Sequence, residues 1–217
     1  MALSLARGVS REAVELAVQR GLLWFGYFRH QSAWFLTDSS RRVIQARRMD
    51  KMRWWRSGPK ALTLPGGQGS WPVGASEVGP FSSVLLMEGG PDLLAAFHFL
   101  ILADRVSTIT AVSMLGAANQ IHPDALGLLS GKSVRIIPHR DEPDEKGRRA
   151  GIDAARRWQN QLKGAGVNAK IINIGSFMPQ TEKFKDLNDA ARLPFMLQAA
   201  IAARLAGLPS ESPPELG

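Results

Sequence analysis

The segment VLLMEGGPDLLAA, residues 84–96, determines the fold class of this chain. Its four leading apolar residues are typical of a short buried strand, and Glu88 follows that strand directly. The apolar run after Pro91 is typical of a helix. Proline is well tolerated in the first turn of a helix, because the N–H that it lacks would have no partner there. A strand that passes into a helix through two glycines predicts an α/β unit with an acidic residue at its junction.

The same alternation of strands and helices continues through the rest of the chain. Further strands are expected at residues 109–114, 134–137 and 169–174, and helices at residues 91–102, 123–129, 151–162 and 187–206. Strands that alternate with helices are joined by right-handed crossovers and pair in parallel. We therefore expect an α/β fold with a mainly parallel four-stranded sheet flanked by helices.

The first 80 residues have a different texture. Ser10 is expected to cap a helix, residues 33–36 and the basic segment 41–49 to pair as a small hairpin, and the Gly- and Pro-rich stretch 51–80 to form a long loop. We predict a small basic N-terminal α+β subdomain with its linker over residues 1–78, the α/β domain over 79–207, and a disordered tail over 208–217.

Charge and cysteine content narrow the function. The chain has 27 lysines and arginines against 19 acidic residues, a net charge of +8, which favours a polyanion such as nucleic acid or an anionic membrane face. A basic enzyme with no such partner is the alternative. The absence of cysteine excludes thiolate zinc sites, so any metal must be held by carboxylates, water or histidine, which suits Mg²⁺ or Mn²⁺.

Membrane insertion is not expected from this sequence. The longest apolar run, residues 93–103, is interrupted by His98 and is too short to cross a bilayer. The N-terminal residues carry no long apolar segment of the kind found in signal peptides. We therefore expect a cytoplasmic protein with no membrane partner.

Acidic residues follow three of the four predicted strands. Sites in open α/β sheets lie beyond the carboxyl ends of the strands, so these residues should meet at one edge. The residues are Glu88 and Asp92 after the first strand, Asp141 and Asp144 after the third, and Asp186 after the fourth. Converging carboxylates repel one another unless a divalent cation bridges them, which is the arrangement used in phosphate chemistry. Solvated loops and acidic helix N-termini are the alternative interpretation.

These segments, in this order, resemble the Toprim domain of bacterial- and phage-type DNA primases. The resemblance covers about residues 84–190 and rests on the strand-Glu-Gly-Asp segment at 84–92, the small-residue turn at 114–118, an Asp-x-Asp…Gly…Ala-Ala pattern at 134–155, and Lys-Asp-Leu-Asn-Asp at 185–189. His139 stands where the first aspartate of the third motif is expected, and extra residues 142–150 precede its glycine, whose counterpart is either Gly147 or Gly151.

The resemblance implies roles for individual residues. Glu88, Asp141 and Asp186 are the implied catalytic residues, and Mg²⁺ or Mn²⁺ would be held by Glu88, Asp92, Asp141, Asp144 and Asp186. The N-terminal segment also resembles the basic subdomain that precedes Toprim in primases. Nucleic-acid or nucleotide binding is therefore expected of Arg41, Arg42, Arg47, Arg48, Lys60, His139 and Lys185.

Several of these residues have plainer interpretations. Arg47 and Arg48 could instead protect a strand edge from pairing with another sheet. Trp34, Trp54 and Trp55 could stack on the bases of a single strand or simply pack within a small domain.

The leading functional hypothesis is primer synthesis, a metal-dependent nucleotidyl transfer on single-stranded DNA, by a primase-like protein of a phage, plasmid or similar mobile element. The chain has no cysteine for a zinc module and no phosphate-binding loop of a helicase motor, so a separate helicase or a zinc-bearing primase partner is expected. The alternatives are a Toprim nuclease and a non-catalytic nucleic-acid-binding module. Strand transfer of the topoisomerase kind needs a tyrosine, and Tyr27, the single tyrosine, is expected in the core.

Overall fold

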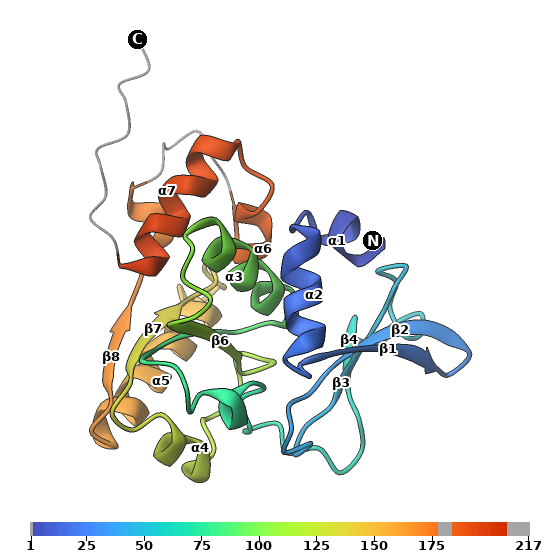
Figure 1. The fold of residues 1–217 in the computed structure, drawn as a ribbon. Helices are drawn as coiled ribbons and strands as arrows, with labels where there is room; N and C mark the ends of the chain where they lie inside the picture. The colour runs from blue at the N-terminus through green and yellow to red at the C-terminus, as the bar shows by residue number, and fades with distance from the viewer. Residues whose placement is uncertain (1, 178–183, 208–217) are drawn as a thin grey trace.

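The computed structural model describes residues 2–177 and 184–207. In this part of the chain the strands form two four-stranded sheets, and Figure 1 shows them side by side with helices between and around them. The first sheet is antiparallel and is built by the N-terminal residues. The second is parallel, so the expected α/β fold with a small N-terminal α+β part is confirmed.

The parallel sheet has the strand order β6-β5-β7-β8. Its strands are β5 (Ser83–Met87), β6 (Ile109–Ser113), β7 (Ser133–Ile137) and β8 (Asn168–Ile171), close to the four that the sequence predicts. The connecting helices are α3 (Gly90–Leu102), α4 (Pro123–Leu128) and α5 (Ala150–Gly164). Because right-handed crossovers leave β5 in one direction and β7 in the other, α3 and α5 lie on opposite faces of the sheet.

The helix α3 is apolar on nearly all sides because it is covered on all sides. It packs on β6, and α2 (Arg11–Gln19), α6 (Leu187–Ala190) and α7 (Phe195–Ala206) pack against it. The predicted helix over residues 187–206 is therefore two helices, and Pro194 stands at the N-cap of the second. The 3-10 helix η2 (Ile174–Phe177) follows β8.

The antiparallel sheet has more strands than the predicted hairpin. Its order is β1 (Leu23–Phe28), β2 (Gln31–Leu36), β3 (Gln45–Arg48) and β4 (Ala61–Thr63). The basic strand begins at Gln45, not at Arg41, because Arg41 has a φ of 51° and belongs to a turn. Tyr27 is 81% exposed on β1, so its expected place in the core is wrong.

The N-terminal helices join the two sheets. Ser10 caps α2 as predicted, accepting a hydrogen bond of 3.2 Å from the Ala13 N–H, whereas α1 (Ala2–Arg7) was not expected. The linker between the sheets contains the 3-10 helix η1 (Ala75–Glu77), and Val73 forms an isolated antiparallel β-bridge with Ser113 on the outer edge of β6.

One hydrophobic cluster runs through both halves of the described chain. It includes Leu22 and Trp34 from the N-terminal part and Leu85 and Phe97 from the parallel-sheet part. The division at residues 78–79 therefore stays a prediction, and the tail over 208–217 lies outside the described residues. Among those residues, no helix is long and apolar enough to cross a membrane.

Close packing at Gly90 fixes how the antiparallel sheet sits on α3. A Cβ added at Gly90 would collide with the Leu36 side chain and lie 3.6 Å from the Trp34 ring. We expect Gly90→Ala to lower the free energy of unfolding by about 1–3 kcal/mol, because an overpacked core must shift to admit the methyl group. Urea denaturation followed by circular dichroism measures this change.

The matched control is Gly127→Ala in α4, where an added Cβ meets nothing within 4 Å. A helical alanine there should be neutral or stabilise by up to about 1 kcal/mol. Equal effects of the two substitutions would contradict the packing of β2 against the start of α3.

Candidate metal centre

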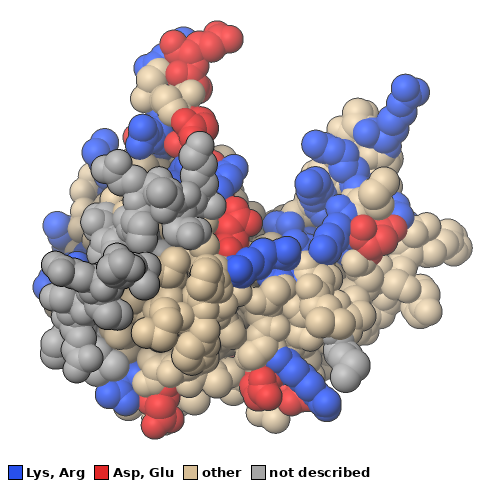
Figure 2. Space-filling model, turned by 90° about the horizontal axis from the view of Figure 1, so that it is seen from above, with Lys and Arg blue, Asp and Glu red and all other residues tan. Residues whose placement is uncertain are grey.

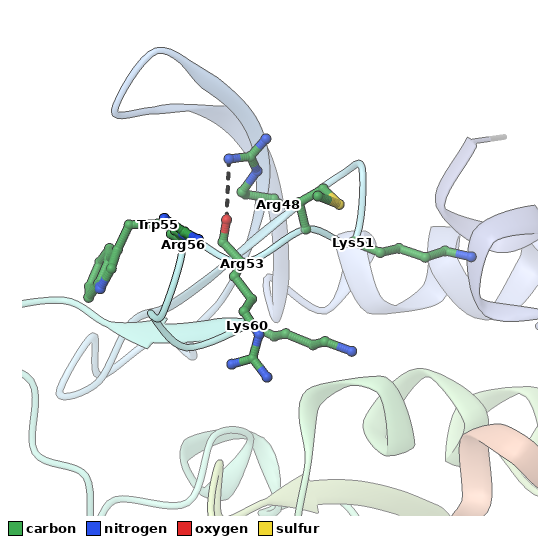
Figure 3. Close-up of a pocket in the computed structure, with 7 residues that line it drawn as sticks. Arg48, Lys51, Arg53, Trp55, Arg56 and Lys60 are labelled. Atoms are coloured by element: carbon green, nitrogen blue, oxygen red, sulfur yellow. Dashed lines mark hydrogen bonds between the residues drawn. The ribbon is translucent and has the colours of Figure 1, made fainter.

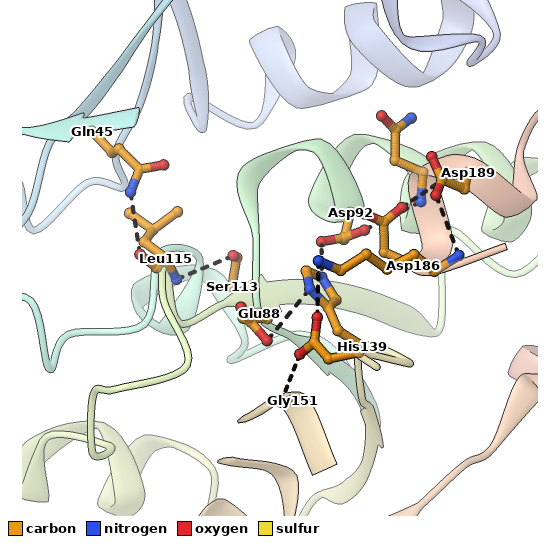
Figure 4. A network of polar contacts seen from close by, with 12 residues as sticks. Gln45, Glu88, Asp92, Ser113, Leu115, His139, Gly151, Asp186 and Asp189 are labelled. Atoms are coloured by element: carbon orange, nitrogen blue, oxygen red, sulfur yellow. Dashed lines mark hydrogen bonds and ion pairs between the residues drawn. The ribbon is translucent and has the colours of Figure 1, made fainter. Parts of the chain in front are cut away.

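Four carboxylates and one histidine meet at the carboxyl end of the parallel sheet. Glu88 follows β5, Asp92 lies in the first turn of α3, and His139 and Asp141 follow β7. Asp186 caps the N-terminus of α6. Ligand atoms of Glu88, His139 and Asp141 lie within 4.8 Å of one another, as do those of Asp92, His139 and Asp186, so the two groups share the histidine (Figure 4).

His139 lies between the acidic groups. Its Nε2 is 2.8 Å from Asp92 Oδ2, and its Nδ1 is 3.5 Å from Glu88 Oε2. The side chains are well enclosed, 15% exposed for His139 and 3% for Asp92. Burial alone would lower the pKa of His139, but the hydrogen bond to Asp92 and the charges of Asp92, Glu88 and Asp186 raise it to about 9. The imidazolium therefore supplies a positive charge at the centre of the cluster.

The pKa values of the carboxylates in the cluster shift in opposite directions. Burial, followed by the charge of Asp92, raises the pKa of Asp186 to about 6. Burial also raises the pKa of Glu88, against the opposing charge of His139. Burial would likewise raise the pKa of Asp141, but the hydrogen bonds from the Lys185 ammonium and the Gly151 N–H lower it overall.

Asp141 is held from two sides. Its Oδ1 is 2.9 Å from Lys185 Nζ, and its Oδ2 accepts a hydrogen bond of 2.9 Å from the Gly151 N–H. Of the two candidate glycines, Gly151 packs closely here, because a Cβ there would lie 2.7 Å from the backbone oxygen of His139, whereas one at Gly147 would meet nothing within 4 Å. The start of α5 therefore packs directly on the residues that follow β7.

The residues present fit a hard divalent cation. The Oε2 atom of Glu88 is buried and accepts no hydrogen bond, so its lone pairs are free for a metal although His139 Nδ1 lies 3.5 Å away. The other possible ligands are carboxylate oxygens, which suit a hard divalent cation, and the ring of His139, which binds a metal only after it loses its proton. We therefore identify this cluster as a candidate metal centre made of two groups, Glu88–His139–Asp141 and Asp92–His139–Asp186.

Asn188 supports the centre and was not expected from the sequence. Its backbone N–H donates to Asp92 Oδ1 over 3.2 Å, and its side-chain amide donates to the Arg7 carbonyl over 2.6 Å. The amide thus ties the N-terminal helix α1 to the acidic cluster. A contact across 181 residues of sequence leaves no local pattern that could have indicated it.

Two arginines add positive charge beside the cluster. The guanidinium groups of Arg7 and Arg47 lie over the Trp34 ring, 5.3 Å and 5.9 Å from its centroid. Burial and the nearby charge of Arg7 lower the pKa of Arg47 to about 10, while Asp92 and Asp186 oppose that shift. Neither arginine forms an ion pair with an acid in the described part of the chain. Arg7 is the second residue of this site that the sequence did not indicate.

The other candidate residues lie elsewhere. Asp144 is outside both groups of the cluster and pairs with Arg148 at 2.9 Å within its own loop. Arg42 pairs with Asp124 at 2.7 Å and stacks on Trp71, so it joins the antiparallel sheet to α4. Arg41 lies in the preceding turn. Arg48 and Lys60 line a separate pocket on the loop between β3 and β4.

The described fold is shared with primase fragments. No protein-family model matches the chain, and no curated protein matches it in sequence. Solved structures do match. The primase fragment of the bacteriophage T7 primase-helicase protein has a TM-score of 0.55 at 16% identity, and the alignment covers 86% of this chain and 66% of that one.

Two further structures extend this similarity. The zinc-binding and RNA polymerase domains of the Aquifex aeolicus primase give a TM-score of 0.57 at 16% identity over 94% of this chain and 54% of that one. A chain from a complex of bacteriophage T7 lagging-strand DNA polymerase with primase domains bound to an RNA/DNA hybrid and dTTP gives 0.50 at 14% identity, over 86% and 82%. The chain thus spans only part of the first two proteins, and at these identities the similarity shows the fold.

The raised pKa of His139 predicts how the metal-free protein responds to pH. A histidine with a folded-state pKa of about 9 and an ordinary value of 6.5 stabilises the fold fully below pH 6.5 and loses that effect as the pH rises to 9. In EDTA, the free energy of unfolding should fall by up to about 3 kcal/mol across this window. Urea titrations at pH 6.5, 7.5, 8.5 and 9.5 (about one-unit steps) measure it.

The control is His139→Asn, which keeps a polar side chain but cannot titrate. Its stability should change much less than that of the wild-type protein over the same window. A parallel decline of the two proteins would mean that His139 is not held in its charged form by Asp92 and Glu88.

Proposed function

We propose that this protein carries out metal-dependent nucleotidyl transfer on single-stranded DNA, the reaction of primer synthesis, through a Toprim-like metal centre. The observation that supports the proposal is a pair of acidic groups at the end of a parallel sheet, Glu88–His139–Asp141 and Asp92–His139–Asp186, with a buried Glu88 oxygen that accepts no hydrogen bond. The fold shared with primase fragments supports the same reaction class.

In this proposal the carboxylates have distinct tasks. Glu88, Asp141 and Asp186 would hold one or two Mg²⁺ or Mn²⁺ ions, and Asp92 would position the His139 ring. When bound, the metal supplies positive charge to the phosphate oxygens of the incoming nucleotide. Lys185, fixed on Asp141 at 2.9 Å, is placed to meet an anionic ligand at the same edge.

Arg7 and Arg47 are proposed to bind the phosphates of nucleotide or template. They are like charges held near one another over one indole ring without an acidic partner in the described part of the chain. Such an arrangement costs free energy until an anion arrives, because the two guanidinium groups repel each other. Guanidinium groups also suit phosphate, since they donate two parallel hydrogen bonds.

A non-catalytic nucleic-acid-binding module is the second candidate. Its supporting observation is that protein cations already pair with the acidic cluster, His139 with Asp92 and Glu88, and Lys185 with Asp141. If those pairs persist with a metal in solution, the cluster is structural. A metal-dependent nuclease would use the same carboxylates. Supplying nucleotides and a single-stranded template separates the three functions. New oligonucleotides indicate primer synthesis, a shortened template indicates a nuclease, and a mobility shift of the template alone indicates binding without catalysis.

Partners follow from the same comparison. The matched T7 fragment comes from a primase-helicase protein, and the Aquifex structure includes zinc-binding domains. This sequence has no cysteine. We therefore propose that a separate helicase or a zinc-bearing primase chain assists this protein on single-stranded DNA.

The metal centre is tested by Glu88→Gln. Loss of the Glu88 charge should weaken Mn²⁺ binding by on the order of 100-fold and abolish metal-dependent primer synthesis, because a neutral amide is a poor ligand for a hard cation. The fold should remain, since glutamine keeps the size of the side chain and the change removes one ion pair, that with His139 Nδ1 at 3.5 Å, and no hydrogen bond of Oε2. Titration calorimetry with Mn²⁺ and Mg²⁺ measures binding, and circular dichroism checks folding.

Asp144→Asn is the matched control, because this carboxylate lies outside the cluster and pairs with Arg148. It should bind Mn²⁺ as the wild-type protein does. Equal binding by Glu88→Gln and the wild-type protein would remove Glu88 from the centre. No metal binding by the wild-type protein, with nucleotide and single strand present, would favour the non-catalytic module.

A further inference from the structure

A basic pocket lies outside the candidate metal centre. It has a volume of about 570 Å³, sits on the loop between β3 and β4 (Figure 3), and is lined by Arg48, Lys51, Met52, Arg53, Trp55, Arg56 and Lys60. Five of these seven residues are cationic, and within residues 2–177 and 184–207 only Arg48 among them has an acidic partner, Asp50. A concave surface with this much unpaired positive charge favours a polyanion.

The surface view places this charge on a projecting part of the molecule. In Figure 2, Lys and Arg side chains gather along the projection on the side of the antiparallel sheet. In Figure 3, the side chains of Lys51 and Lys60 extend in the same direction, and Trp55 lies on the other side of the pocket. A ligand in the pocket would therefore meet cationic groups and an aromatic ring together.

The loop that forms the pocket is held in shape. The Trp54 ring packs edge-on against Phe28, with centroids 5.2 Å apart, and its Nε1 donates to the Ala46 carbonyl over 3.2 Å. The Trp54 N–H donates to the Pro59 carbonyl over 3.1 Å, and Arg53 Nη1 donates to the Gly58 carbonyl over 2.8 Å. A loop already fixed in shape loses little conformational freedom when it binds a ligand.

The two neighbouring tryptophans differ in exposure. Trp54 is 7% exposed and belongs to the small apolar cluster under the sheet, whereas Trp55 is 46% exposed. The Trp55 ring lies against Gly58, where any Cβ would collide with it, and the Arg29 guanidinium is 5.3 Å from the ring centroid. Packing therefore accounts for Trp54 but leaves much of the Trp55 ring open to a ligand.

The pocket is separate from the metal centre because adjacent residues of β3 point to opposite faces of the sheet. Arg47 lies over Trp34, on the face toward Asp92 and Asp186, whereas Arg48 lines the pocket. A ligand in the pocket would thus contact the side of the antiparallel sheet that faces away from the acidic cluster.

We propose that this pocket is an anchor for single-stranded nucleic acid, in which one base stacks on Trp55 and the flanking phosphates contact Lys51, Arg53 and Arg56. The proposal extends the proposed function, from which it takes the class of ligand. Stacking on an aromatic ring beside cations binds a strand with little regard to sequence, because every base has a flat π face. The anchor would raise affinity for the strand without contributing to metal binding.

The first test measures, by fluorescence anisotropy in EDTA, the binding of fluorescein-labelled oligo(dT) about 20 nucleotides long. Trp55→Ala should raise the dissociation constant by roughly 10-fold, the loss expected for one stacked base. Trp55→Phe, which keeps a flat ring, should stay close to the wild-type protein. Binding by Trp55→Ala equal to that of the wild-type protein would overturn the anchor, as would the absence of any wild-type binding.

The second test measures the salt dependence of the same binding. Lys51→Ala/Arg56→Ala should reduce the slope of log K against log salt by about 1.4, since each phosphate contact on a single strand contributes about 0.7. Lys163→Ala/Lys170→Ala removes the same charge from exposed positions in α5 and β8 and should leave the slope unchanged. Equal slopes for the two double variants would contradict phosphate contacts in the pocket.

Two further measurements separate this proposal from its alternatives. A labelled oligo-glutamate peptide that binds as tightly as oligo(dT), with no effect of Trp55→Ala, would overturn the anchor in favour of an acidic protein partner. If Glu88→Gln keeps metal binding while Trp55→Ala loses strand affinity, the anchor holds and the proposed function fails. If Glu88→Gln loses metal binding while Trp55→Ala keeps its strand affinity, the anchor alone is overturned.

Discussion

The repulsion among Glu88, Asp92, Asp141 and Asp186 is the constraint on which the site depends. These four carboxylates come from three segments of the sequence, and the fold brings them to one edge of the parallel sheet. Without a metal, the opposing charge comes from the protein, through His139 between Glu88 and Asp92 and through Lys185 on Asp141. The surrounding carboxylates raise the pKa of His139, while burial, followed by the charge of Asp92, raises the pKa of Asp186.

The antiparallel sheet is part of this electrostatic arrangement and not a separate appendage. Gly90, at the start of α3, lets Trp34 and Leu36 approach, and Trp34 in turn lies beneath the guanidinium groups of Arg7 and Arg47. The close packing therefore places two cations next to the acidic cluster. The acidic cluster and the two arginines come from different halves of the chain, so they lie beside one another only when both sheets are packed together.

The sequence predicted what local patterns can encode. Glu88 and Asp141 were found because each follows a short apolar strand, and the parallel sheet followed from the alternation of elements. Asn188 was missed because its amide contacts the Arg7 carbonyl across 181 residues of sequence, and Arg7 was missed because its guanidinium reaches the site only by packing over Trp34. The strand start at Gln45 also mattered, because only the register of β3 shows that Arg47 faces the metal centre and Arg48 the pocket. Asp144 matched the acidic pattern but pairs with Arg148 within the extra residues of its own loop.

The single strand β3 explains how one small sheet can present two basic surfaces. Alternation of side chains sends Arg47 inward, where burial lowers its pKa, and Arg48 outward, where Asp50 pairs with it. A buried arginine without an acidic partner suits one fixed phosphate, because its desolvation is offset only by close contact with an anion. The exposed cations around Trp55 suit a strand that can shift in register, since their interactions with phosphate are screened and individually weak. Under the two proposals, the difference in burial between the faces fits one fixed phosphate at the candidate metal centre and a strand bound in variable register at the pocket.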